Sequence, residues 1–138
     1  MRRKIKKHSR KILFPGKPII KEWLHSHKRT FYLNTEQLDR ISFSILKDEN
    51  EKIKEIQNVS YEININGKWV RIVRYDDHSG TGSLHRHTKF SFSSLKEIIE
   101  SLPWIKGDKN QQLTQACNDI KENYEEFKNE FTKNSGLD

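Results

Sequence analysis

Apolar and polar residues alternate in the middle of the chain. Isoleucine or phenylalanine alternates with serine over residues 41–45, and the same period of two returns over 59–65 and 68–75. Residues 84–92 form a fourth stretch of this kind. A period of two is typical of strands with one buried face. The pattern therefore predicts about four strands, which short connections would join into an antiparallel sheet.

Asn66-Gly67 lies directly between two of these stretches. Both residue types tolerate the positive φ angles of a type I′ turn, which makes this pair a strong hairpin signal. The turn predicts a register with Glu62 opposite Arg71 and Tyr61 opposite Ile72. The expected core face carries Tyr61, Ile63, Ile65, Val70 and Ile72, and the expected opposite face carries Glu62, Asn64, Trp69, Arg71, Val73 and Tyr75. In the stretch after the loop, Phe90 and Phe92 are expected in the core.

Spacings of three and four residues predict three helices. The first is short and spans residues 18–27, and the second spans 94–102 behind a capping-box pattern that begins at Ser94. The long closing helix has an apolar stripe from Leu113 to Phe131. We therefore expect an α+β fold, in which a small antiparallel sheet has helices packed on one face and the last helix is long.

Charge divides the chain into two parts. Residues 1–33 hold eleven Lys/Arg and one acid, which gives +10, whereas the rest holds fifteen Lys/Arg and eighteen acids, which gives −3. We expect residues 1–15 to be a basic flexible arm and residues 16–138 to be one domain. Such an arm attracts phosphates or an acidic protein, although a solvated tail has the same composition. The one cysteine, Cys117, lies in the helical stripe and excludes an internal disulfide. With no apolar membrane span and no secretory segment, the expected location is cytoplasmic.

The segment from Arg74 to His87 holds the candidate chemistry. His85 and His87 share one face of a strand, and the connecting loop returns Asp76 to the same sheet edge. Two histidines with a carboxylate can act as general base and general acid near neutral pH. RNA suits such a site because its 2′-hydroxyl is the nucleophile. The predicted catalytic residues are His85, His87 and Asp76, and the predicted RNA-binding residues are Arg71, Arg74, Tyr75, Arg86 and Lys89, with Trp69 as a further stacking residue.

The same cluster fits two other interpretations. Imidazole and carboxylate groups are ligands for zinc-like or iron-like ions, so the chain could be a small metal-binding protein. The cluster could also be structural, within a non-catalytic module that binds nucleic acid or protein. The residues alone leave these alternatives open.

A resemblance rests on the residues of this segment. The residues Gly67-Lys68-Trp69, Val73-Arg74-Tyr75-Asp76, Gly80 and His85-Arg86-His87 resemble a pattern in short prokaryotic proteins, in which a strand precedes R-Y-D-x-x-H-G and then H-x-H or similar. The stretch is also similar to the TumE-like toxin components of toxin–antitoxin pairs. Ser79 stands at the family's histidine position and His78 lies one residue early. Asp76, His85 and His87 are therefore the residues that the resemblance carries over.

The resemblance implies a toxin-like protein of a prokaryotic or phage system. Together with the candidate chemistry, it leads us to expect an endoribonuclease that needs no metal or other cofactor. Its expected partners are RNA and a cognate antitoxin-like protein, and we expect no membrane association.

Overall fold

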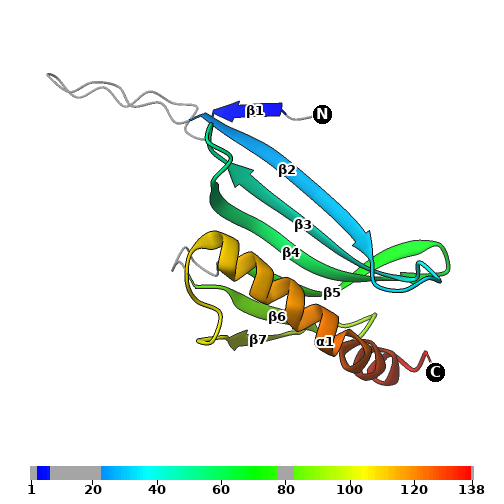
Figure 1. Ribbon diagram of the computed structural model, residues 1–138. Helices are drawn as coiled ribbons and strands as arrows, with labels where there is room; N and C mark the ends of the chain where they lie inside the picture. The colour runs from blue at the N-terminus through cyan, green and yellow to red at the C-terminus, as the bar shows by residue number, and fades with distance from the viewer. Residues whose placement is uncertain (1–2, 7–22, 78–82, 138) are drawn as a thin grey trace, which may run out of the picture.

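The computed structural model describes residues 3–6, 23–77 and 83–137. In these ranges the chain forms one antiparallel sheet, whose strands follow one another in chain order, and one long helix. Figure 1 shows the helix lying across one face of the sheet. The elements are β1 (Arg3–Lys6), β2 (Trp23–Tyr32), β3 (Asp39–Lys47), β4 (Ile53–Ile65), β5 (Lys68–Asp76), β6 (His85–Lys89), β7 (Glu97–Ser101) and α1 (Lys109–Ser135).

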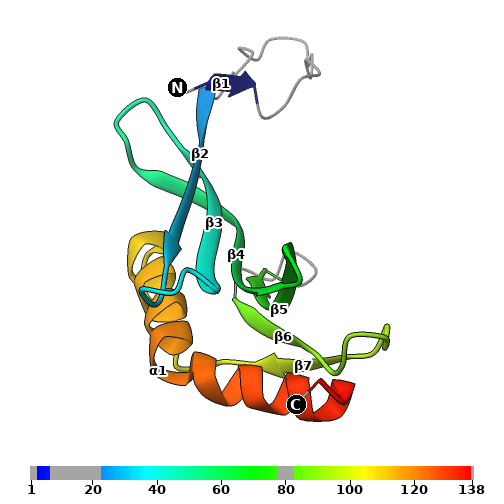
Figure 2. The ribbon, with the colours of Figure 1, turned by 90° about the vertical axis from the view of Figure 1, so that its right-hand side faces the viewer.

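The predicted α+β class with a long C-terminal helix is confirmed. The sheet is larger than the expected four strands, since seven pair in the described ranges. The strands β2 to β4 are long and extend beyond the helix, and Figure 2 shows how strongly the sheet twists between β2 and β7. No helix in the described part of the chain is long and apolar enough to cross a membrane.

The core lies between α1 and the central strands. The helix begins at a capping box, where Asp108 accepts from the backbone of Gln111 and the Gln111 side chain accepts from the backbone of Asp108. It ends at Gly136, whose φ of 69° is the left-handed conformation that favours glycine. The predicted stripe of α1 is confirmed: Leu113, Ala116, Cys117, Ile120 and Phe131 are buried. Burial raises the pKa of the Cys117 thiol to about 11, as suits a packed and unreactive cysteine.

The β4–β5 hairpin has the predicted turn. Asn66 and Gly67 have φ angles of 51° and 85°. The predicted register holds from Ile65 opposite Lys68 to Glu62 opposite Arg71. Beyond that point it is wrong, because a bulge makes Val73 the partner of Tyr61 in place of Ile72.

The bulge reverses which side chains at the end of β5 face the helix and which face away from it. Val73 and Tyr75 pair with Tyr61 and Val59 and are completely buried on the helix side, where the sequence pattern predicted the opposite face. Arg74 and Asp76 consequently lie on the face that α1 does not cover. We call this the open face. The bulge therefore decides which charged residues of β5 meet the histidines of β6.

Two predicted helices are wrong. Residues 23–27 belong to β2, and residues 18–22 lie outside the described part of the chain. The second predicted helix, 94–102, contains β7, and the Ser94 hydroxyl accepts from the nearby backbone of Lys96. The apolar residues of this segment are not buried on one stripe as a helix would need, since Leu95 is 98 % exposed.

Two further expectations need correction. Phe90 and Phe92 are exposed because β6 ends at Lys89, so they do not enter the core. Residues 3–6 of the expected flexible arm form β1, which pairs with β2, and the rest of the arm lies outside the described residues.

Candidate functional site

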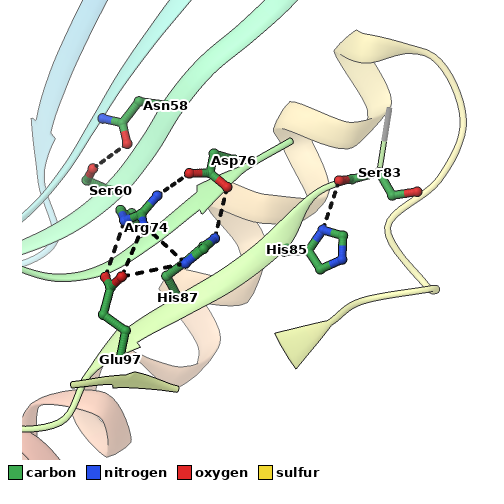
Figure 3. A network of polar contacts seen from close by, with 8 residues as sticks. All are labelled: Asn58, Ser60, Arg74, Asp76, Ser83, His85, His87 and Glu97. Atoms are coloured by element: carbon green, nitrogen blue, oxygen red, sulfur yellow. Dashed lines mark hydrogen bonds and ion pairs between the residues drawn. The ribbon is translucent and has the colours of Figure 1, made fainter. Parts of the chain in front are cut away.

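The centre of the candidate site is His87 on the open face of β6. Its cross-strand partner is Arg74 of β5, and β7 follows on its other side. Figure 3 shows the imidazole between Arg74, Asp76 and Glu97. Nε2 of His87 lies 2.9 Å from Oδ1 of Asp76, and Nδ1 lies 3.1 Å from a terminal nitrogen of Arg74. Strand alternation predicted that His87 lies on the non-core face of the sheet. Its side chain is nevertheless only 2 % exposed.

The partners of His87 assign its tautomer. A guanidinium only donates hydrogen bonds, so Nδ1 must be the accepting nitrogen. The ring proton of the neutral imidazole is then on Nε2, which donates to the carboxylate of Asp76. Asp76 thereby fixes the orientation of the ring and directs Nδ1 toward Arg74 and Glu97. This is the relationship between an orienting carboxylate and a general base in catalytic triads.

Arg74 connects the two carboxylates of the cluster. It makes an ion pair with Asp76 and donates to both oxygens of Glu97, at 3.1 and 3.3 Å. Burial lowers the pKa of Arg74, but its hydrogen bond to Glu97 and the charge of Asp76 outweigh burial, so the pKa is raised overall. One guanidinium therefore faces two carboxylates.

The pKa of Glu97 depends on its contact with Arg74. The hydrogen bond from Arg74 lowers the pKa of Glu97 below its ordinary value of 4.5, against the opposing effect of burial. The stabilisation that ionised Glu97 contributes is complete above pH 4.5 and is lost as the pH falls through the lowered pKa.

We therefore expect Glu97→Gln to remove part of the acid sensitivity of the fold. In urea unfolding measured at neutral and at acidic pH, the wild-type chain should lose more stability than Glu97→Gln on acidification. Glu122→Gln, an exposed change on α1, is the matched control and should behave as wild type. Equal acid sensitivity of wild type and Glu97→Gln would show that the ion pair with Arg74 contributes nothing.

His85 precedes His87 by two residues on β6 and is the cross-strand partner of Asp76 on β5. Its Nδ1 lies 3.2 Å from the backbone carbonyl of Ser83, which can only accept. Nδ1 is therefore protonated, and Nε2 is the accepting nitrogen of the neutral ring. Figure 3 shows the His85 imidazole beside Ser83, apart from the contacts around His87. Of the predicted catalytic residues, His87 contacts Asp76 directly, and His85 is the cross-strand partner of Asp76.

A groove on the open face borders His87. Its volume is about 430 Å3. Its lining includes three cationic side chains and the exposed apolar residues Phe92 and Leu95. The polar lining comprises Arg71, Arg74, His87, Lys89 and Glu97, with Trp69 at the same groove.

Two predicted RNA-binding residues lie on the other face. Tyr75 is completely buried beneath α1, and its hydroxyl donates to Asp119. Arg86 donates to the same carboxylate at 2.6 Å and also pairs with Glu100. The bulge in β5 turns Tyr75 to the helix side of the sheet. Arg86 lies on the helix side because side chains alternate along β6 and His87 is on the open face. Both residues attach the helix to the sheet, so we assign them no contact with RNA.

The arrangement does not converge on a metal ion. Asp76 and Glu97 approach different nitrogens of the His87 ring. In residues 3–6, 23–77 and 83–137, no group of three or more His, Cys, Asp or Glu side chains is placed to hold one. His78 lies outside these ranges.

Glu97 was not predicted as a site residue, because residues 94–102 were expected to form a helix. Arg74 and Asp76 were predicted as site residues, but no sequence signal marked the bulge that puts them on the open face. Lys89 and Arg71, which were predicted to bind RNA, both line the groove, and the Lys89 ammonium also donates to the carbonyl of Ser94.

Comparison with known proteins identifies the family without identifying a reaction. The sequence model of a family described as a domain of unknown function (DUF7718) matches residues 23–137. No curated protein and no solved structure matches the chain. The match spans the whole sheet from β2 onward and the helix, so the chain belongs to this family.

Proposed function

We propose that this member of the DUF7718 family is a toxin-like protein that cleaves single-stranded RNA at the groove beside His87, without a metal ion. The observation that carries the proposal is the contact between His87 and Asp76 in a groove with three cationic side chains. A carboxylate-oriented imidazole supplies a base, and Arg71, Arg74 and Lys89 supply charge for a phosphate.

The proposed reaction uses the substrate's own nucleophile. His87 takes the proton of a 2′-hydroxyl through Nδ1, and the 2′-oxygen attacks the adjacent phosphorus. The bond from phosphorus to the 5′-oxygen breaks, and protonated His85 gives that oxygen its proton. The products are a 2′,3′-cyclic phosphate and a 5′-hydroxyl end.

Arg74 has a dual part in this scheme. Without substrate it donates to Nδ1 of His87, at 3.1 Å. A phosphate oxygen is a stronger acceptor for a guanidinium than a neutral imidazole is, because the hydrogen bond is then between opposite charges. Binding of the phosphate therefore turns Arg74 toward the substrate and leaves Nδ1 available as a base.

A specific observation favours a second candidate function. His87 is almost fully buried and both of its nitrogens have partners, which also describes a structural histidine. In that case the groove binds nucleic acid without cleaving it. The two candidates differ in whether RNA is broken, not in whether it is bound.

Expression in a bacterial host tests the biological part of the proposal. Induced wild-type protein should arrest growth and fragment cellular RNA, whereas Asp76→Asn should be less toxic because its ring orientation is weakened. Asp77→Asn, the adjacent acid, is the matched control and should be as toxic as wild type. Normal growth with wild-type protein present at full level contradicts the toxin-like function.

The antitoxin-like partner belongs to the same proposal, and we place it at β7. This strand is exposed throughout and is the last in the sheet, with Ile98 and Ile99 both about half exposed. An edge of this kind accepts a further strand from another protein. β7 borders the groove through Glu97, so a partner strand paired with β7 would lie beside the proposed RNA site. A co-expressed product of the neighbouring gene should restore growth with the wild-type toxin but not with Ile99→Lys.

A further inference from the structure

An aromatic cluster borders the groove on the strands that lead away from His87. It consists of Tyr32 at the end of β2, Arg40 on β3 and Trp69 on β5. The ring centroids of Tyr32 and Trp69 lie 6.2 Å apart at an interplanar angle of 35°. The guanidinium carbon of Arg40 lies 3.9 Å from the centroid of the Trp69 ring. These three side chains come from three strands and meet on the open face.

An ion pair holds the cluster in place. Nε of Arg40 lies 2.6 Å from Oε1 of Glu62, on the strand between β3 and β5. The ion pair with Glu62 therefore fixes the Arg40 guanidinium over the indole of Trp69. Trp69 in turn lines the groove. A side chain that is already ordered loses little conformational entropy when a ligand packs against it. Tyr32 remains 48 % exposed, so its ring is accessible to a ligand.

The cluster continues the charged part of the groove. Arg71 follows Trp69 by two residues on the same strand and is exposed. Its cross-strand partner Glu62 is already paired with Arg40. Arg71 itself forms no ion pair with the residues that the structure describes. Aromatic side chains for bases and a cation for the backbone thus lie next to each other.

We propose that Trp69 and Tyr32, supported by Arg40, form a base-stacking platform for single-stranded RNA on the 5′ or 3′ side of the scissile phosphate. This proposal rests on the proposed function, since it takes the groove beside His87 as the RNA site. Stacking on an aromatic ring needs an unpaired base and is largely independent of its identity. The platform therefore selects single strands over duplexes without strict sequence preference.

Binding measurements with an RNA analogue that cannot be cleaved test the platform. The probe is a short, fluorescein-labelled 2′-O-methyl oligonucleotide, whose blocked 2′-oxygen cannot attack the phosphorus. Trp69→Ala should weaken its binding in fluorescence anisotropy by about tenfold or more. Tyr32→Ala should weaken binding in the same direction, and it opens no core cavity because Tyr32 is exposed. Trp104→Ala is the matched control, since Trp104 is exposed and does not line the groove.

The salt dependence separates stacking from charge. Trp69→Ala should lower the affinity at every salt concentration and leave the slope of log affinity against log salt unchanged. Arg71→Gln should reduce that slope by about 0.7, the value for one phosphate contact on a single strand. A duplex of the same sequence should bind more weakly than the single strand.

The binding measurements test the stacking platform separately from the proposed cleavage. If Trp69→Ala and Tyr32→Ala both bind the analogue as Trp104→Ala does, the platform is wrong, whether or not wild-type protein cleaves RNA. Equal binding of duplex and single strand also overturns it. If the analogue binds through Trp69 but natural RNA stays intact, the platform stands and the proposed cleavage fails.

Discussion

Replacing His87 by glutamine should slow RNA cleavage strongly while the chain stays folded. The glutamine amide can still donate to Asp76 and fills much of the same space, but it cannot take up a proton. General base catalysis contributes on the order of 10²–10⁴ in rate, so the loss should lie in that range. The rate is measured on labelled single-stranded RNA, and folding is checked by urea unfolding of the same sample.

The alanine variant of His87 serves as the comparison. It leaves Asp76 and Arg74 each with one partner fewer and opens a space at a side chain that is 2 % exposed. We expect it to lose about 2–3 kcal/mol of unfolding free energy. Loss of activity in His87→Ala alone, with His87→Gln fully active, would assign His87 a structural role and favour the non-catalytic binding module.

The largest effect on stability is expected at Asp119 of α1. Its carboxylate is buried and accepts hydrogen bonds from the Tyr75 hydroxyl and the Arg86 guanidinium. The distance to the guanidinium nitrogen of Arg86 is 2.6 Å. Asp119→Ala leaves the guanidinium of Arg86 with Glu100 as its remaining ion pair, at the exposed edge. Removing one member of a buried ion pair costs about 3–5 kcal/mol, and we expect a loss toward the lower end because Glu100 remains.

Urea unfolding checks the prediction for Asp119. Asp119→Asn should lose less than Asp119→Ala, because its amide oxygen can still accept from Tyr75. Glu122→Ala, an exposed change one turn along α1, should stay within about 0.5 kcal/mol of wild type. If Asp119→Ala proved as stable as Glu122→Ala, the contact with Tyr75 and Arg86 would not hold the helix on the sheet.

The hairpin could be predicted from the sequence because its turn is local. Asn66-Gly67 needs only the φ preferences of two residues, and the register follows by counting from them as far as Glu62 and Arg71. The bulge at Ile72 could not be predicted in this way. It moves Tyr75 from the open face into the core, and the sequence near it looks like an uninterrupted strand.

The segment after β6 shows a different limit. Ser94 to Leu102 has both a capping-box pattern and apolar spacing for a helix, yet residues 97–101 pair with β6 as β7. Local spacing cannot reveal that the sheet offers an unpaired edge at this point. This error concealed Glu97, which completes the cluster around Arg74.

Half of the site was nevertheless visible in the sequence. Alternation along β6 predicted that His85 and His87 share one face, and the structure places Asp76 in contact with His87 and opposite His85 in the strand pairing. The burial of His87 was not visible, because it depends on Arg74 and on β7. Tyr32 and Arg40 were missed because they reach Trp69 only through the pairing of three strands.

Cleavage of single-stranded RNA in the presence of a metal chelator tests the proposed reaction. Purified wild-type protein should cut the strand under these conditions and leave 2′,3′-cyclic phosphate and 5′-hydroxyl ends. A fully 2′-deoxy strand should stay intact, and His87→Gln should be slower by the factor given above. An intact RNA strand, cleavage that the chelator stops, or equal cleavage by folded His87→Gln would contradict the proposed reaction.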